Sequence, residues 1–247
     1  MTDRPAETPA PVRFRDDVTA DLIKHSASDS DVLWAARVST AGEQSLGELT
    51  KDPERSKGLI NYLMRDRHGS PFEHNSMTFF ISAPIFVFRE FMRHRVGWSY
   101  NEESGRYREL QPVFYVPGPE RKLVQQGRPG KYEFVHGTPE QHKAVVAAME
   151  ESYAQSYAAY QEMLAAGVAR EVARATLPVG LYSSMYATCN ARSLMHFLGL
   201  RTQHELARVP SFPQREIEMV GERMEAAWAE LMPLTYAAFN ANGRVAP

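Results

Sequence analysis

The chain of 247 residues is 43% hydrophobic and carries a formal net charge of -2 at neutral pH. This is enough apolar material for a buried core, arranged as one large domain or as two closely joined parts. The small net charge argues against a general nucleic-acid coat and against a binder of anionic membranes. The single cysteine, Cys189, excludes a disulfide framework and a cysteine-rich metal cluster.

The first half of the chain begins with a proline-rich stretch at 1–14 that lacks apolar periodicity, which predicts a mobile tail. Apolar spacing and turn residues then predict five regular elements before the middle of the chain. They are a strand at 18–25, a helix capped by Asp29 or Ser30, a helix at 54–67, a strand at 76–82, and a helix from Pro84 through Arg95, after which Gly97 leads into a loop at 98–107.

The second half begins with a short strand at 113–116 and a Gly- and Pro-rich stretch at 117–137, which predicts a flexible insertion. Thr138 and Gln141 form a capping box for a long helix to about Ala166, whose tyrosine stripe is interpreted as core. The remaining elements expected are a helix at 169–176, a strand at 181–188, a helix from Asn190 to Thr202, a loop at 205–213 and a helix from 214 to about 231. This mixture predicts an α+β fold with helices packed on a small, mostly antiparallel sheet.

The segment from Arg93 to Tyr107 carries the clearest chemical signal, because it combines cations, serines, glycines and aromatic rings. Arginine forks match phosphate oxygens in pairs, Ser104 and the backbone N–H beside Gly105 add neutral donors, and aromatic faces can stack on a flat ring. We interpret the segment as a nucleotide site rather than a solvated basic turn. Ser104 is expected to bind phosphate and not to act as a nucleophile, because no base lies in a serine–histidine–carboxylate order.

This segment also resembles the signature of the flavin-dependent thymidylate synthases, in the order Arg-His-Arg, a spacer, and Ser-Gly-Arg-Tyr. Further blocks that match the family's order extend from about residue 30 to residue 201. They are Arg37–Ser39, His68–His74, Ala83–Val87, Arg170–Arg174 and Asn190–Leu194. The resemblance implies one compact catalytic domain over 15–247, assembled as a homotetramer with active sites at subunit contacts.

The resemblance implies reductive methylation of dUMP to dTMP, with methylenetetrahydrofolate as one-carbon donor, NADPH as reductant and FAD as the bound cofactor. Arg201 matches the arginine that orients the uracil and favours its ionisation, so it is the expected catalytic residue. The residues expected to bind dUMP are Glu90, Arg93, Glu102, Glu103, Ser104, Gly105, Arg106, Arg174 and Arg201. Read without the resemblance, Arg174 and Arg201 fit ordinary ion pairs equally well, and Arg89 is interpreted as a surface salt bridge.

The resemblance also assigns residues to the flavin, while His68 and Glu73 fall where the family approaches the reacting rings. The residues expected to contact FAD are Ser39, Ser70, Arg93, His94, Arg95, Val96, Glu102, Asn190, Arg192 and His196. A lone histidine such as His196 is more often a packed residue than a ligand contact, so its assignment depends on the resemblance alone. No set of His, Cys, Asp or Glu shows metal-ligand spacing, and no Gly-rich dinucleotide fingerprint is present.

Two arginines of the helix expected after Asn190 face different directions. Arg192 and His196 lie one turn apart, whereas Arg201 lies nine residues from Arg192 and so on roughly the opposite face, at about 100° per residue. One helix cannot easily present both arginines to a single pocket of its own subunit. This geometry favours sites completed by neighbouring subunits.

The chain departs from the family pattern at several positions. Eight residues, Val96 to Glu103, separate Arg95 from Ser104, where the usual signature has seven, and a bulge near Gly97 would absorb the extra one. Glu90 stands where many members have glutamine, and a carboxylate there repels phosphate unless it faces the base or an arginine. His196 stands where some members have asparagine, and His204 is a candidate for the family's later flavin histidine.

Two other classes of protein share parts of this pattern. A flavoprotein reductase would bind flavin without transferring a methyl group, and a nucleotide or RNA binder would be colourless when purified. Cys189 is interpreted as a packing residue, so activation of the pyrimidine depends on Arg201 and the cofactor instead of a thiolate. Neither a leader-like segment nor a spanning apolar run is evident, so we expect a cytoplasmic protein whose partners are small molecules, with no nucleic acid and no membrane.

Overall fold

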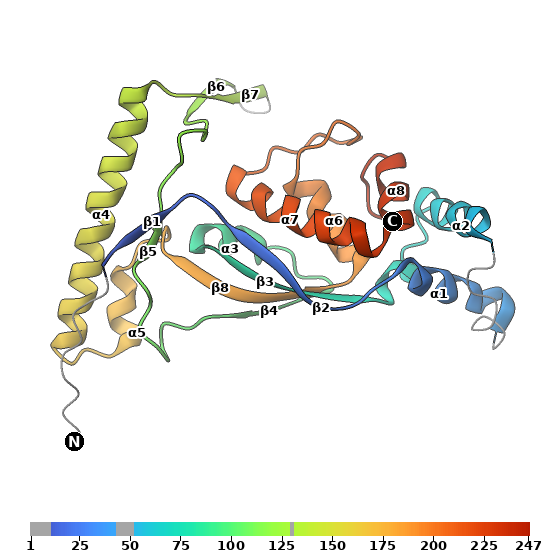
Figure 1. Ribbon diagram of the computed structural model, residues 1–247, viewed down its shortest axis with the longest axis horizontal. Coiled ribbons are helices and arrows are strands. Elements are labelled where there is room, and N and C mark those ends of the chain that lie inside the picture. Colours follow the sequence, from blue (N-terminus) through green and yellow to red (C-terminus); the bar gives the residue numbers. More distant parts are fainter. Residues whose placement is uncertain (1–10, 43–51, 129–130) are drawn as a thin grey trace. The chain divides into compact units, whose positions relative to one another are not determined.

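The computed structural model describes residues 11–42, 52–128 and 131–247 (Figure 1). Contacts within the chain group them into two compact units. The first comprises the residues up to Asp17, Pro84–Phe86 and Glu103–Ser183, and the second comprises Val18–Ala83, Val87–Glu102 and Ser184–Pro247. The single domain expected over 15–247 stays a prediction.

The second unit is built on a four-stranded sheet with the strand order β2-β3-β8-β4. Its strands are β2 (Thr19–Ser26), β3 (Ser76–Pro84), β8 (Tyr182–Cys189) and β4 (Trp98–Glu102). The β2/β3 and β4/β8 pairs are antiparallel. Every second residue of β3 is fully buried, at Met77, Phe79 and Ile81, because successive side chains of a strand point to opposite faces. The α+β class is confirmed.

Helices cover this sheet and its ends (Figure 1). They are α1 (Asp29–Ala41), α2 (Pro53–Arg65), α3 (Ile85–Phe91), α6 (Ala191–Arg201), α7 (Arg215–Leu231) and α8 (Pro233–Ala241), with a 3₁₀ turn at Ser70–Glu73. α7 packs against β2 and α6, and α2 packs against α8. The buried face of α7 repeats at helical spacing, through Ile217, Val220, Met224 and Trp228.

The first unit is organised along α4 (Pro139–Ala165), which carries α5 (Arg170–Ala173) and the 3₁₀ turn Arg174–Thr176. The capping box of Thr138 and Gln141 is present, as the sequence predicts. Tyr153, Tyr157 and Tyr160 are the buried residues of α4, which confirms the aromatic stripe as core. A short parallel pair, β1 (Arg13–Arg15) and β5 (Val113–Tyr115), completes this part of the unit.

The predicted helix from Pro84 through Arg95 is wrong at both ends, because Pro84 closes β3 and α3 ends at Phe91. Beyond Phe91 the backbone N–H groups of Arg93 and His94 bond three residues back, to Glu90 and Phe91. The phenol of Tyr100 donates to the carbonyls of Phe91 and His94, at 3.2 and 2.6 Å. These bonds satisfy carbonyls that a helix end leaves open, so the chain turns here.

Four other expectations also need correction. The loop expected at 98–107 begins with strand β4, which Gly97 enters at a φ of 69°. The insertion at 117–137 contains an antiparallel hairpin of β6 (Val124–Arg128) and β7 (Lys131–Val135). Within the expected tail, Arg13 and Phe14 lie in β1, while residues 1–10 lie outside the described residues. Helix α8 was not predicted, and the Asp29 carboxylate accepts from the N–H groups of Leu234 and Thr235 at its start.

Candidate active site

Arg201, the last residue of α6, forms a polar cluster with two side chains from α3 and the turn after it. Its Nη1 lies 2.6 Å from Oε2 of Glu90, and its Nε donates to Nε2 of His94 at 3.1 Å. The Arg201 and Glu90 side chains are 22% and 29% exposed, so water screens this pair only in part. The Glu90 carboxylate therefore faces an arginine, and the cluster holds one guanidinium in a fixed orientation.

The electrostatic state of His94 follows from this contact. A guanidinium only donates, so Nε2 of His94 is the acceptor and the ring proton lies on Nδ1. Burial, followed by the electrostatic effects of Arg201 and then of His196, lowers the pKa of His94 to about 4. The ring packs edge-on against Phe197, at 4.9 Å between centroids. Arg93-His94-Arg95 is therefore two cations and one neutral ring at pH 7.

Asn190 precedes α6 and Val96 lies in the turn before β4, and the sequence predicts flavin contacts at both residues. Asn190 is the N-cap residue, and its Oδ1 accepts from the backbone N–H of Ser193 at 2.9 Å. Ser193 Oγ in turn donates to the Val96 carbonyl at 3.0 Å. These bonds fix the turn at Gly97 against α6, and they leave the Val96 side chain 90% exposed.

Arg192, one residue into α6, has different partners from those of Arg201. Its Nε donates to the main-chain oxygen of Pro247 at 2.7 Å, and its Nη1 pairs with Glu73 Oε1. Gly69 lies directly under the guanidinium, where a Cβ would collide with it. The two arginines thus meet separate sets of residues, as the helical spacing predicts. Burial, together with Arg192 and Arg67, lowers the pKa of His196.

Several other residues that are expected to contact ligands are exposed. Arg93 and Arg95 are exposed, and neither forms an ion pair within residues 11–42, 52–128 and 131–247. Ser70 is exposed at the start of its 3₁₀ turn. Ser39 is exposed on α1, although its hydroxyl donates to the Ala36 carbonyl at 2.9 Å. Arg89 is exposed too, and the described residues supply no salt-bridge partner for it, contrary to expectation.

The first unit carries the turn at Ser104, Gly105 and Arg106. The Arg106 backbone N–H bonds to Ser104 Oγ at 3.3 Å, and its guanidinium pairs with Glu171 at 3.3 Å. Gly105 is buried so closely that a Cβ there would lie 3.2 Å from Cδ of Arg174. The turn and Arg174 are therefore neighbours, as a shared anion site requires.

The remaining two expected substrate residues stand on either side of the boundary between β4 and this turn. Glu102 ends β4 opposite Met185, and Glu103 pairs with Arg108 at 3.1 Å. Nothing in these contacts assigns either carboxylate to a ligand.

Three residues near the cluster were missed by sequence reasoning. Tyr100 closes the turn that holds His94, and Thr202 and Arg244 form a buried network directly after Arg201. The aromatic Tyr100 stood in a recognised motif, but the motif does not say what its hydroxyl binds. An isolated arginine such as Arg244 offers no sequence signal of burial.

Comparisons with known proteins show the family to which the chain belongs. The family described as "Thymidylate synthase complementing protein" matches residues 21–234. The chain is 84% identical to a flavin-dependent thymidylate synthase of Streptomyces avermitilis, over the full length of both, and 57% identical to one of Tropheryma whipplei, over 95% of this chain and 97% of the relative. The chain belongs to the flavin-dependent thymidylate synthase family.

A solved structure extends the comparison to three dimensions. The crystal structure of a UMP/dUMP methylase, PolB from Streptomyces cacaoi, bound with 5-Br dUMP, is 56% identical to the chain, with a TM-score of 0.91. The match covers 96% of this chain and 100% of that one. Membership of the flavin-dependent thymidylate synthases makes the protein an enzyme with a flavin cofactor.

The described residues suit a flavin nucleotide, which carries phosphate and a flat ring. Arg93 and Arg95 are exposed and form no ion pair with another described residue, so their guanidinium forks have the geometry that phosphate oxygens accept. Cys189, in contrast, is 2% exposed, and burial raises the pKa of its thiol. The thiol therefore packs in the core and is not available as a nucleophile, as the sequence predicts.

Within residues 11–42, 52–128 and 131–247, no group of three or more His, Cys, Asp or Glu is placed to hold a metal ion. None of the helices described there is long and apolar enough to span a bilayer.

Proposed function

We propose that the protein catalyses the reductive methylation of dUMP to dTMP. Methylenetetrahydrofolate supplies the one-carbon unit, and NADPH supplies the reducing equivalents through bound FAD. The names of the bacterial relatives support this reaction, and so does the 5-Br dUMP bound by the solved relative. The halogen of that ligand stands on the pyrimidine carbon that a thymidylate synthase methylates.

One observation carries the proposal: Arg201 is held between Glu90 and a neutral His94, while the only cysteine is buried. An enzyme without an available thiolate needs another way to activate the pyrimidine. A fixed guanidinium stabilises negative charge that develops on the uracil, and it needs no reorganisation during the reaction. The neutral acceptor on His94 orients Arg201 without adding a second positive charge. Arg201 is therefore the catalytic residue that we assign.

The remaining substrate contacts are assigned by the chemistry of each group. Ser104, the N–H groups around Gly105, Arg106 and Arg174 are donors that suit a phosphate, and Gly105 lets backbone and ligand approach closely. We assign dUMP to the set Glu90, Arg93, Glu102, Glu103, Ser104, Gly105, Arg106, Arg174 and Arg201.

FAD, when bound, carries the hydride from NADPH toward the transferred carbon. The protein's part is to hold the cofactor: Arg93, Arg95 and Arg192 bind anionic oxygens, and Ser39 and Ser70 add hydroxyl donors. We assign FAD to the set Ser39, Ser70, Arg93, His94, Arg95, Val96, Glu102, Asn190, Arg192 and His196. The homotetramer and the cytoplasmic location stay predictions.

The test combines a spectrum with an assay of product. The purified protein should absorb at about 450 nm, as a bound flavin does, and should release tritium from dUMP labelled at C5 when given NADPH and methylenetetrahydrofolate. Arg201→Ala should abolish release while the absorbance stays. A yellow protein that releases no tritium would be a reductase, and a colourless protein would be a nucleotide binder. Normal turnover by the variant would remove Arg201 from the mechanism.

A second substrate, UMP, is favoured by one observation. The solved relative PolB is described as a UMP/dUMP methylase, and a second PolB structure, bound with 5-Br UMP, is 54% identical to this chain with a TM-score of 0.87. Competition between UMP and labelled dUMP measures the preference directly. The 84% identity to a thymidylate synthase leads us to expect dUMP to have the higher kcat/KM.

A further inference from the structure

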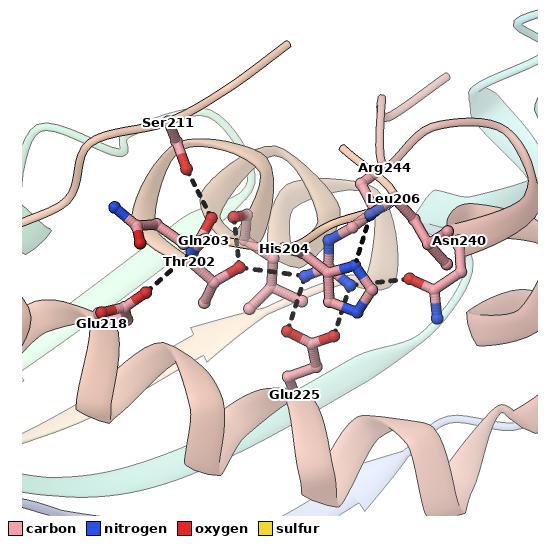
Figure 2. A network of polar contacts seen from close by, with 10 residues as sticks. Thr202, Gln203, His204, Leu206, Ser211, Glu218, Glu225, Asn240 and Arg244 are labelled. Atoms are coloured by element: carbon pink, nitrogen blue, oxygen red, sulfur yellow. Dashed lines mark hydrogen bonds and ion pairs between the residues drawn. The ribbon is translucent and has the colours of Figure 1, made fainter. Parts of the chain in front are cut away.

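A buried network lies beside the catalytic arginine, at the point where α6 ends (Figure 2). Its centre is Arg244, whose side chain is 1% exposed. Arg244 donates from both terminal nitrogens to Glu225, at 2.6 and 2.7 Å, and from Nη1 to Asn240 at 2.8 Å. Its Nη2 also donates to Thr202 Oγ1 at 3.0 Å. The guanidinium thus joins α7, α8 and the residue that follows Arg201.

The backbone of Arg244 is held in an unusual conformation. Its φ is 55°, in the left-handed region that non-glycine residues rarely adopt at low cost. The preceding Gly243 has a φ of 73°, and its carbonyl accepts from the Arg208 N–H at 2.9 Å. Contacts on both side chain and backbone therefore fix Arg244, which is what keeps a strained residue in place.

Two further contacts bring this segment against α6 itself. At Gly199 a Cβ would lie 3.1 Å from the Arg244 carbonyl oxygen, so the helix and the Arg244 backbone approach closely. Thr202 Oγ1, which accepts from Arg244, donates to the Leu198 carbonyl at 2.8 Å. The Thr202 carbonyl accepts from Ser211 Oγ at 2.6 Å. The last turn of α6 is thereby fixed through both the side chain and the main chain of Thr202.

We infer that Arg244 is a positioning residue for Arg201, acting through the hydroxyl of Thr202. Arg201 has no contact with Arg244, but it precedes Thr202, and its guanidinium must meet both Glu90 and His94. A small rotation of the last helical turn would break the 3.1 Å bond to His94. The expected effect on catalysis rests on the proposed function, because it assumes that Arg201 acts on dUMP.

A purely structural role for the network is the alternative. A buried ion pair such as Arg244 with Glu225 contributes little net stability compared with well-packed apolar residues, so stability alone does not account for it. The bond from Arg244 to Thr202 is separate from that pair and ends next to Arg201. Its removal therefore distinguishes positioning from stability.

The test compares Thr202→Val with Thr202→Ser in the full-length holoprotein. Valine keeps the branched shape, including the methyl that packs on Gly221, but it removes the acceptor for Arg244. Serine keeps the hydroxyl. We expect valine to raise KM for dUMP about tenfold, through loss of a hydrogen bond to a charged donor, with flavin content unchanged. Serine should restore a KM close to that of the native protein.

A readout independent of catalysis is the ¹⁵N chemical shift of His94 Nε2, which reports whether Arg201 Nε still donates to it. We expect Thr202→Val to change this shift and Thr202→Ser to preserve it. A native shift and a native KM in Thr202→Val would overturn the inference. If the proposed reaction is wrong, the native protein will not turn over dUMP, yet the His94 shift still decides whether the link exists.

A second variant covers the case in which Thr202→Val fails to fold. The pair Arg244→Met with Glu225→Met removes both buried charges together, so neither is left without a partner. The inference expects the same change in the His94 shift in this folded double variant. An unchanged shift there would also overturn it.

Discussion

At the scale of single residues, Glu90 offsets the positive field of the Arg201 guanidinium. Glu90 lies 2.6 Å from it and partly neutralises the cation that the uracil would use. A glutamine at this position keeps an acceptor oxygen for Arg201 and removes the negative charge. We therefore expect Glu90→Gln to leave KM for dUMP equal or lower.

Glu90→Ala is the matched comparison, because it removes the acceptor as well as the charge. Arg201 then keeps only His94 as an orienting contact, and we expect KM for dUMP to rise about tenfold. Steady-state kinetics on both variants measures this difference. Equal KM values in Glu90→Gln and Glu90→Ala would show that Glu90 does not orient Arg201.

His94 makes the stability of the fold depend on pH. Its pKa is about 4 in the folded protein, because of burial and Arg201, and about 6.5 in the unfolded chain. Between these values the unfolded chain binds the extra proton, so stability is fully present above pH 6.5 and falls as the pH falls to 4. After allowing for the partial exposure of the ring, the loss is about 2 kcal/mol.

Urea unfolding at pH 7 and pH 4.5 checks this expectation. The native protein should lose more stability between the two pH values than His94→Gln does, since glutamine does not titrate. His136→Gln is the matched control, because His136 is an exposed histidine in the first unit and should behave as the native protein. Parallel losses in all three proteins would show that groups other than His94 cause the pH dependence.

At the scale of the elements, the turn between α3 and β4 depends on Gly97. Its φ is 69°, and a Cβ there would collide with Ser193 Oγ and lie 3.2 Å from Asn190 Nδ2. We expect Gly97→Ala to lower the free energy of unfolding by about 2 kcal/mol, from backbone strain and overpacking together. Flavin content should also fall, since the turn carries Arg95 and Val96.

Gly58→Ala provides the control for this change. Gly58 lies in α2, and nothing stands within 4 Å of the position of its Cβ. Alanine there should raise stability slightly, by about 0.5 to 1 kcal/mol, because glycine is a poor helix former. Thermal melts of both variants give the comparison. Equal melting temperatures of Gly97→Ala and Gly58→Ala would show that the Gly97 turn tolerates a side chain.

Local rules predicted the elements whose signals lie within a few residues of each other. Thr138 and Gln141 are three residues apart and mark the start of α4 correctly, and alternating Met77, Phe79 and Ile81 mark β3. The end of α3 was missed because the phenol that satisfies its carbonyls comes from Tyr100, on the next strand. Helix propensity depends on the residues of the helix itself, so it cannot indicate a partner from another strand.

The candidate site shows the same limit more strongly. The motifs identified its residues, but Glu90 and Arg201 are 111 positions apart, and only the fold shows that they form an ion pair. The burial of Arg244 could not be predicted, because the sequence does not distinguish a buried arginine from an exposed one until its partners are known. Neutral His94 was likewise hidden, since its protonation follows from burial and from Arg201.

At the scale of the whole molecule, α6 raises the question of how many chains build one active site. Arg192 at its start contacts Glu73 and Pro247, whereas Arg201 at its end contacts Glu90 and His94. We assign the first arginine to the flavin and the second to the uracil. If the two face different pockets, each pocket needs a second copy of the chain, as the proposed homotetramer provides.

Mixing two inactive variants tests this directly. Arg192→Ala is expected to lack activity when FAD is limiting. Arg201→Ala is expected to lack activity at every FAD concentration. After joint unfolding and refolding in equal amounts, sites that take the two arginines from different chains receive both native residues in roughly a quarter of cases. We therefore expect tritium release at about that fraction of native activity. Sites that take both arginines from one chain would stay inactive in every mixed assembly, so absence of release despite mixed tetramers would show that a single chain supplies both arginines of a site.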